Sequence, residues 1–234
     1  MDRTVLRGPY EDPSFYLPRK PAQEFARKHT IYGPGEPSNL LYMVRSGRVL
    51  VRNSFDSTSP SVTRIVSARG MFGEASLIGS PDPGEWAITL DRSSVMSWTM
   101  AEVEQQMTRD ARLRSALLSY FALRCAELTE RLEALAFYRT QERVMLGLLQ
   151  LAETLGAPMN GATRMAPLSH KIIADYVGTS RELVTLHMCE FRQAGLLQYS
   201  RSFIDANVPL MRQELDRRGI DRSASEGRMV RTAV

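Results

Sequence analysis

The stretch from Leu168 to Ala206, LSHKIIADYVGTSRELVTLHMCEFRQAGLLQYSRSFIDA, decides how the second half of the chain folds. Ser169 is placed to cap a short helix, because a serine hydroxyl accepts a hydrogen bond from an unpaired N–H of the first turn. Gly178 ends that helix, since glycine adopts the left-handed conformation without a steric penalty. Ser180 then caps a second helix, which runs to Ala194. Two short helices joined by a glycine turn predict a helix-turn-helix.

A two-stranded wing is predicted directly after the second helix. Gly195 stops that helix, and Leu196–Ser200 and Phe203–Ala206 flank a turn at Arg201 and Ser202. In a helix-turn-helix of this kind the second helix lies in the major groove of DNA, with its first turn facing the base edges.

The first turn of the second helix carries groups that can read bases. Arg181 can donate two hydrogen bonds to a guanine, and Glu182 can accept one from a cytosine. Thr185, one turn further along, is placed to touch a thymine methyl group or a phosphate. The alternative is that Arg181 and Glu182 form only a solvated first turn, with Glu182 favoured by the helix dipole. Within the helix-turn-helix frame we favour contact with DNA, and the expected residues are Ser169, Thr179, Ser180, Arg181, Glu182, Thr185 and Arg201.

Residues 178–184, Gly-Thr-Ser-Arg-Glu-Leu-Val, and residues 193–197, Gln-Ala-Gly-Leu-Leu, resemble the cyclic-AMP receptor protein and fumarate–nitrate regulator family. The usual pattern in its winged helix-turn-helix is Ser-Arg-Glu-Thr-Val-x-Arg-x-Leu. This chain keeps the Ser-Arg-Glu and the valine, and Met188 replaces the leucine. Leu186 stands where family members usually carry a second base-reading arginine. The resemblance implies a DNA-binding transcription regulator, although not the family's usual half-site sequence.

The first half of the chain reads as short strands separated by Gly/Pro turns, which is typical of a jelly roll. Residues 35–49 and 70–78 resemble the cyclic-nucleotide-binding β-roll of the same family. The expected fold class is therefore α+β, with an N-terminal β-roll, a long dimerisation helix and a C-terminal winged helix-turn-helix. We expect a β-roll over 1–110, the dimer helix and hinge over 111–137, the DNA-binding domain over 138–206, and a short helix with a flexible tail over 207–234. Residues 20–28 are predicted to form one further helix in the lead-in.

The resemblance implies an effector pocket inside the roll. In nucleotide-binding members a glutamate after Phe-Gly holds the ribose hydroxyl, and Glu74 matches it. An arginine followed by a serine or threonine holds the cyclic phosphate, but Glu85 and Trp86 occupy those two places and the next arginine is Arg92. A carboxylate repels a phosphate, so we expect an effector other than cyclic AMP, or none. Candidate pocket residues are Glu74, Glu85, Trp86 and Thr129, the last standing where some members have a hydroxyl that reaches the pocket.

Residues 112–136 contain no proline or glycine and predict one long amphipathic helix. The apolar side chains recur at steps of three and four, which is typical of a coiled-coil seam. Such a helix can pack on its own roll, but a small roll cannot bury the whole stripe. We therefore expect a two-fold dimer helix, with Leu117, Phe121, Leu128, Leu132 and Leu135 at the interface.

Composition indicates which partners the chain binds and in which cell compartment it works. The 234 residues carry a formal charge of +4, and from Arg164 onward eleven Lys and Arg stand against eight Asp and Glu. This mild excess suits phosphate contacts at the DNA-reading end. No apolar run is long enough for a membrane span, and the N-terminus lacks the apolar core of a signal peptide. Two cysteines cannot supply an iron–sulfur cluster, and a reducing cytoplasm is the expected compartment.

The leading hypothesis is a homodimer that binds double-stranded DNA at a palindromic operator, with RNA polymerase as a further partner and an unidentified small-molecule effector. We expect no cofactor, because His29 is the only histidine before residue 170 and haem needs an axial ligand. Two alternatives remain. One is an interaction module that has lost DNA binding, which Leu186 favours. The other is a cupin-like metal enzyme, although the roll lacks the clustered histidines of such a site.

Overall fold

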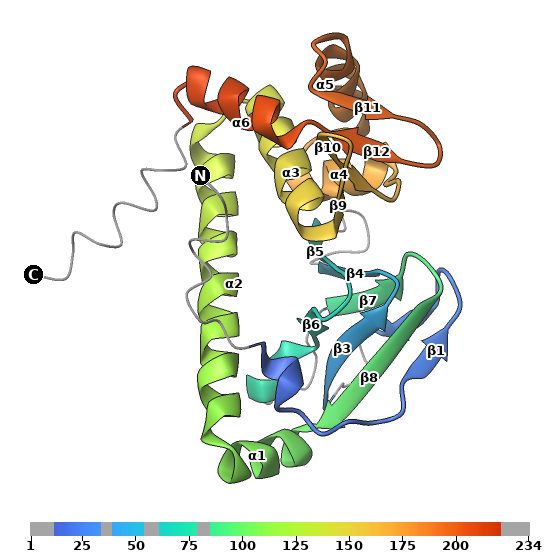
Figure 1. Cartoon of the computed structure of the whole chain (residues 1–234), viewed down its shortest axis with the longest axis vertical. Helices are drawn as coiled ribbons and strands as arrows, with labels where there is room; N and C mark the ends of the chain where they lie inside the picture. The colour runs from blue at the N-terminus through green and yellow to red at the C-terminus, as the bar shows by residue number, and fades with distance from the viewer. Residues whose placement is uncertain (1–11, 34–38, 54–60, 79–84, 221–234) are drawn as a thin grey trace, which may run out of the picture. The chain divides into compact units, whose positions relative to one another are not determined.

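The computed structural model describes residues 12–33, 39–53, 61–78 and 85–220, and everything below concerns these ranges. The chain forms two compact units, residues 1–133 and 134–234, and the division falls inside the long helix α2 (Ala111–Phe137). Figure 1 shows a strand-rich first unit and a mainly helical second unit. The part of the predicted flexible tail that follows Ile220 lies outside the described residues.

Two four-stranded antiparallel sheets make up the roll, in the orders β1-β8-β3-β6 and β2-β7-β4-β5. The strands are β1 (Gln23–Phe25), β2 (Thr30–Tyr32), β3 (Leu40–Ser46), β4 (Val49–Asn53), β5 (Ser61–Val66), β6 (Met71–Phe72), β7 (Glu85–Thr89) and β8 (Ser93–Thr99). Two 3₁₀ helices, η2 (Pro13–Phe15) and η3 (Glu74–Ile78), accompany them. The predicted helix over 20–28 is wrong, because Gln23, Glu24 and Phe25 pair with β8 as an edge strand.

The interior of the roll lies between the two sheets. Its core contains apolar side chains from all eight strands, because residues two apart in a strand face the same side. Tyr32, Tyr42 and Phe72 stack there, with ring centroids 5.4 Å and 4.9 Å apart for the Tyr32–Tyr42 and Tyr42–Phe72 pairs. Each buried aromatic ring stabilises the roll by about 1.5–3 kcal/mol relative to exposure.

A second core joins the roll to the helices that follow it. Helix α1 (Met100–Arg109) begins with a capping box between Thr99 and Glu102, and α2 follows after one residue. Trp98 of β8 packs with Leu113 and Leu117 of α2, all of them almost fully buried. The first turns of α2 are therefore part of the roll's own core.

The second unit is built on α3 (Thr140–Leu155), whose middle is buried from Val144 to Ala152. The other elements are β9 (Ala157–Met159), β10 (Ala162–Met165), α4 (His170–Val177), α5 (Arg181–Gln193), β11 (Leu197–Tyr199), β12 (Ile204–Ala206) and α6 (Val208–Arg217). The strands form one antiparallel sheet in the order β11-β12-β10-β9. The turn between β9 and β10 consists of Asn160 and Gly161, both with positive φ, as a tight hairpin requires.

Candidate DNA-reading surface and effector site

The two helices predicted from residues 168–194 are present, and the predicted residues cap them. The Ser169 hydroxyl accepts from the Ile172 N–H at 3.2 Å, and the Ser180 hydroxyl accepts from the Leu183 N–H at 3.3 Å. Gly178 ends α4 with φ 77° and ψ 49°, the left-handed conformation. Val184 and Met188 on the inner face of α5 are buried. The opposite face of α5 is therefore left in solvent.

Arg181 and Glu182 stand exposed at the start of α5. Among the described residues, Arg181 makes no hydrogen bond or ion pair with another side chain. Glu182 differs, because hydrogen bonds from its own backbone N–H and from the Ser180 hydroxyl hold the pKa of its carboxyl below the usual value. Arg181 is therefore free to meet a ligand, whereas Glu182 also serves the cap of its own helix.

Thr185 uses its hydroxyl inside the protein. The Oγ1 atom donates to the Arg181 carbonyl at 2.9 Å and lies 2.7 Å from Nδ1 of His170. Burial, and then the charge of Arg181, lower the pKa of His170, so the ring is neutral at pH 7. A neutral ring with its proton on Nδ1 donates to the Thr185 hydroxyl, which in turn donates to the Arg181 carbonyl. Both polar side chains then have a hydrogen-bond partner inside the protein. The sequence pattern did not single out His170, since a partner fifteen residues away leaves no local signal.

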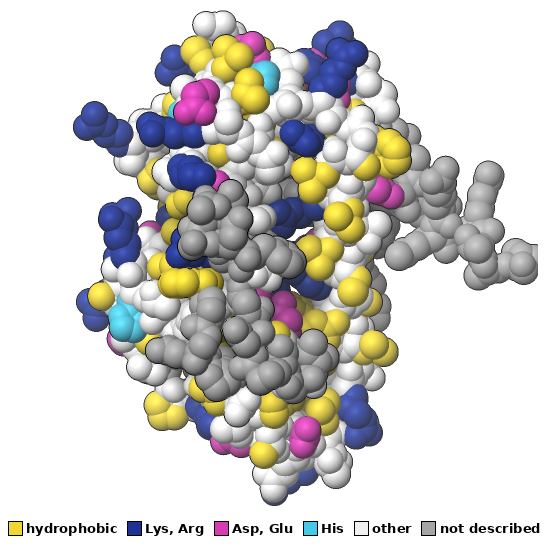
Figure 2. All heavy atoms as spheres, turned by 180° about the vertical axis from the view of Figure 1, so that it is seen from behind, with side chains coloured by type: hydrophobic (Ala, Val, Ile, Leu, Met, Phe, Trp, Pro, Cys, Tyr) yellow, Lys and Arg dark blue, Asp and Glu magenta, His cyan; other side chains and the backbone are white. Residues whose placement is uncertain are grey.

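The wing forms as predicted, with β11 antiparallel to β12 and Arg201 exposed between them. Arg164 of β10 binds Asp205 through two contacts of 2.6 Å and stacks on Phe203 at 4.4 Å, which fixes the base of the wing. Arg192 stacks on Tyr199 at 5.1 Å. Figure 2 shows several Lys and Arg side chains projecting from the part of the surface formed by α5 and the wing.

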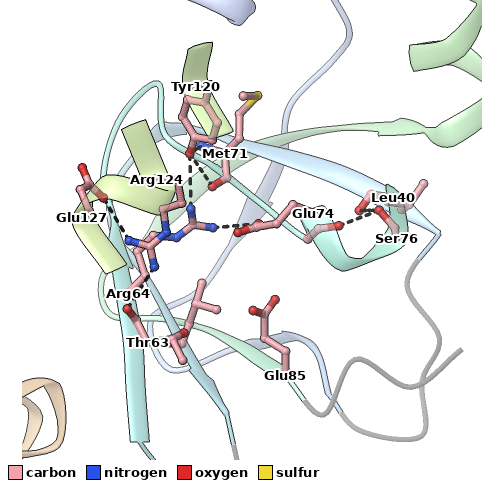
Figure 3. Close-up of polar contacts among 12 residues, drawn as sticks. Leu40, Thr63, Arg64, Met71, Glu74, Ser76, Glu85, Tyr120, Arg124 and Glu127 are labelled. Atoms are coloured by element: carbon pink, nitrogen blue, oxygen red, sulfur yellow. Dashed lines mark hydrogen bonds and ion pairs between the residues drawn. The ribbon is translucent and has the colours of Figure 1, made fainter. Parts of the chain in front are cut away.

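A polar cluster inside the first unit links the roll to α2 (Figure 3). Arg64 of β5 binds Glu74 of η3 at 2.9 Å and Tyr120 of α2 at 3.4 Å. The Tyr120 hydroxyl also donates to the Met71 carbonyl at 3.0 Å and accepts from the Met71 N–H at 3.1 Å. Burial disfavours the charged guanidinium of Arg64, but the nearby Glu74 raises its pKa above the usual value. Arg64 is therefore a charged, largely buried bridge between strand, 3₁₀ helix and long helix.

Glu85 points toward the same cluster from β7, as Figure 3 shows. Its carboxylate accepts a hydrogen bond from the Tyr32 hydroxyl. Burial raises the pKa of Glu85, the Tyr32 hydrogen bond opposes this, and the charge of Glu74 adds to the rise. The Nε atom of Arg64 is buried without a partner among the described residues. Two carboxylates and two arginines therefore lie near one another: Arg64 is already bound to Glu74, and the charge of Arg124 of α2 also acts on Glu85.

The structure brings only part of the predicted pocket together. Glu74 and Glu85 approach each other, whereas Trp86 faces the other side of β7, where the guanidinium of Arg52 lies 4.8 Å from its ring. Thr129 is exposed on α2, and its hydroxyl donates to the Cys125 carbonyl at 3.0 Å. Although Arg92 is the next arginine after Trp86 in the sequence, Arg64 of β5 lies beside Glu74 and near Glu85 in the fold. The pairing of β5 with β4, next to β7, carries Arg64 into the interior, and only tertiary structure determines that placement.

Two arginines of α2 bind this helix to the roll. Arg124 donates to the Thr63 carbonyl at 3.3 Å and binds Glu127 at 3.0 Å. Arg131, two turns later, contacts the same carbonyl and also donates to the Val62 carbonyl at 3.1 Å. These contacts hold one face of α2 against β5.

The other face of α2 is apolar and exposed. Leu117 belongs to the roll's own core at 5% exposure, so its assignment to the dimer interface is wrong. Leu118 is instead 72% exposed and Leu132 66%, and Leu128 and Leu135 are also exposed, while Phe121 is half-buried. Figure 2 shows hydrophobic side chains along the length of this helix. The predicted single seam is in fact two stripes, one packed on the roll and one facing solvent.

The described residues also bear on a metal site and on a membrane span. Within the described ranges, no three His, Cys, Asp or Glu side chains gather as metal ligands would. None of the helices in those ranges combines the length and hydropathy needed to cross a bilayer.

Comparisons with known proteins agree with this architecture. Residues 22–110 match the cyclic nucleotide-binding domain, and residues 142–212 match the Crp-like helix-turn-helix domain. The chain is 30% identical over 187 residues to a CRP-like cAMP-activated global transcriptional regulator of Mycobacterium tuberculosis, covering 75% of this chain and 79% of that protein. It is 24% identical over 191 residues to the global nitrogen regulator of a Nostoc species, covering 80% and 86% of the two chains.

Solved structures show the same fold. FixK2 from Bradyrhizobium japonicum superposes with a TM-score of 0.70 at 22% identity, covering 81% of this chain and 95% of its own. A CRP/FNR-family transcriptional regulator from Thermus thermophilus gives a TM-score of 0.67 at 24% identity, covering 82% and 96%. With a β-roll, a long helix and a winged helix-turn-helix in this order, the chain belongs to the CRP/FNR family of DNA-binding transcription regulators.

Proposed function

We propose that the chain regulates transcription as a homodimer on a palindromic operator, with α5 of each copy in the major groove. The exposed guanidinium of Arg181 at the capped start of α5, unpaired among the described residues, carries this proposal. A guanidinium free of internal partners can donate two hydrogen bonds to guanine without breaking a bond in the protein. The exposed Arg201 at the wing tip contacts the phosphate backbone beside that groove.

The exposed stripe of α2 supports the dimer. Leu118, Ala122, Cys125, Thr129 and Leu132 are all exposed and follow each other at steps of four and three. This spacing keeps one face toward a partner helix. Burying a leucine stabilises an interface by about 1.5–3 kcal/mol. The same stripe on a second copy of the chain would bury these leucines.

Cys125 offers a direct test of this dimer, because it lies in the middle of the stripe. In a parallel two-fold pair each residue of the stripe faces its own copy, so Cys125 would meet Cys125 at disulfide distance. We expect a Cys189→Ser protein to form a cross-linked dimer under mild oxidation. The same protein with Leu118→Asp and Leu132→Asp should sediment as a monomer and not cross-link. A monomer before any substitution would refute the dimer.

We propose that the effector, if one exists, is not cyclic AMP. The M. tuberculosis relative is named as cAMP-activated, so the nucleotide is the natural comparison. In this chain Glu74 and Glu85 lie near two arginines, but Arg64 already binds Glu74 and Arg124 already binds Glu127. A cyclic phosphate would bring a further negative charge to a site with no excess of positive charge among the described residues. Millimolar cyclic AMP should leave the melting temperature unchanged, and a saturable rise would overturn this proposal.

The regulatory path runs along α2. The division between the two units falls inside this helix, and its first part is bound to the roll through Tyr120, Arg124 and Arg131. We propose that the roll biases the orientation of the DNA-binding units by population shift at the hinge near Phe137. RNA polymerase is the proposed partner, and transcription in vitro from a bound promoter would decide between activation and repression.

The decisive experiment selects genomic fragments with the purified protein and sequences them. A two-fold-symmetric motif with half-sites about one helical turn apart is expected. Recovery of unrelated fragments would instead favour an interaction module without DNA specificity, the second candidate, which the exposed leucine at position 186 favours. A gel-shift with excess random DNA separates these two results.

A further inference from the structure

Leu186 lies on α5, and the role argued for it below rests on the proposed binding of α5 to DNA. Successive residues of a helix are about 100° apart, so Leu186 stands roughly opposite Val184 and Met188. Those two side chains are buried, whereas Leu186 is 51% exposed. Leu186 therefore stands on the outward face of α5, where a ligand of this helix would meet it.

The polar groups beside Leu186 are already engaged. The Thr185 hydroxyl donates to the Arg181 carbonyl at 2.9 Å and lies 2.7 Å from His170 Nδ1, so it has no proton left for a base or a phosphate. Glu182 accepts hydrogen bonds from its own N–H and from Ser180. Beyond Arg181, the centre of this face therefore offers a leucine side chain and a threonine methyl group rather than hydrogen-bonding groups.

The major groove contains one apolar feature, the 5-methyl group of thymine. A leucine placed over a guanine or cytosine edge would cover donors or acceptors that then lose their water, which costs binding free energy. Over a thymine it gains a hydrophobic contact instead. We infer that Leu186 selects a thymine in each half-site by packing on its 5-methyl group. The base pair read at this place is thus T·A, chosen by an apolar contact.

The test removes only the methyl group. Operator duplexes from the genomic selection are synthesised with deoxyuridine in place of thymidine, one half-site thymine at a time in both half-sites. At one position, replacing thymine by uracil should weaken binding of the unaltered protein by about fourfold per half-site. This is the value expected for a buried methyl-sized group. Leu186→Ala should bind the normal duplex more weakly and show no difference between thymine and uracil there.

Leu210→Ala is the matched control, because Leu210 is 42% exposed but lies on α6. It should keep the full thymine preference. Leu186→Arg, put through the same selection, should replace the thymine by guanine at that one position, since arginine reads guanine N7 and O6.

Three results decide the question. If no thymine is sensitive to loss of its methyl group, or if Leu186→Ala keeps the same sensitivity, the inference is wrong while the regulator proposal stands. If the protein recovers no motif at all, the DNA-reading proposal fails and takes this inference with it. If the loss of one thymine methyl group weakens binding of the unaltered protein and of Leu210→Ala but not of Leu186→Ala, both the DNA-reading proposal and the role of Leu186 are supported.

Discussion

Arg64 Nη2 and Glu74 Oε2 lie 2.9 Å apart in the interior of the roll, with the Tyr120 hydroxyl on the other side of the guanidinium. In a roll that bound a nucleotide at Glu74, this carboxylate would face the ligand. Here it faces an arginine of the same chain. The ion pair therefore joins β5 and η3 to each other, and Tyr120 extends the connection to α2.

Breaking this ion pair should destabilise the first unit. The side chains are 11% and 29% exposed, so removing one leaves the other charge poorly solvated. We expect Glu74→Gln and Arg64→Ala each to lower the free energy of unfolding by about 3–5 kcal/mol, measured by urea denaturation. Lys171→Gln, which removes an exposed ion pair with Asp175, is the control and should cost less than about 1 kcal/mol. Equal losses in all three variants would contradict a special role for Arg64 and Glu74.

Glu85→Gln should have the opposite effect and depend on pH. The folded-state pKa of Glu85 is raised above its usual 4.5, first by burial and then by Glu74. The unfolded chain therefore releases this proton more readily, so stability is lost as pH rises from the usual value through the folded pKa. Glutamine keeps an acceptor for Tyr32 without the charge. The melting temperature at pH 7 should rise by about 2–4 °C, the shift that corresponds to about 1 kcal/mol in a chain of this size.

A pH series supplies the control for Glu85. Well below the usual pKa of a glutamate, both proteins carry an uncharged side chain at position 85, so the two melting temperatures should converge. A difference that is the same in acid and at neutral pH would mean that the charge of Glu85 is not the cause.

Gly178→Ala should damage the helix-turn-helix more than Gly195→Ala. Both glycines have positive φ, 77° and 71°, so alanine, whose Cβ is crowded in the left-handed conformation, costs about 1–2 kcal/mol at each. A Cβ at Gly178 would also lie 3.1 Å from Leu135 Cδ2, whereas no atom of the described residues lies within 4 Å at Gly195. Thermal unfolding should show the larger loss for Gly178→Ala. Equal losses would indicate that Leu135 shifts without cost.

Arg181→Ala should relax base discrimination rather than weaken all binding. Loss of two hydrogen bonds to one guanine costs about 1–3 kcal/mol on the operator, with little change on random DNA. Competition gel-shifts with the selected operator and with operators changed at single positions would measure this. Arg201→Ala, at the wing tip, should lower binding to both kinds of DNA alike. If Arg181→Ala behaves in the same way, Arg181 contacts phosphate only.

The sequence predicted the elements that depend on local chemistry. Ser169, Gly178 and Ser180 mark their helix ends because capping and positive φ involve neighbouring residues. The strand pattern and the winged helix-turn-helix were readable for the same reason, and the comparisons confirm the family. The strand at residues 23–25 could not be predicted in this way, because an edge strand is defined by its pairing with β8 and not by its own residues.

Tertiary structure decided everything that depends on distant residues. Arg64 meets Glu74 and Tyr120, and Thr185 meets His170, through pairing and packing that no local pattern records. The apolar residues of α2 were visible in the sequence, but only the fold divides them into Leu117, packed against Trp98, and Leu118, exposed to solvent. Sequence alone determined which side chains the chain carries and the period at which they recur. Their partners were decided by the fold, because burial and charge compensation depend on distances in space.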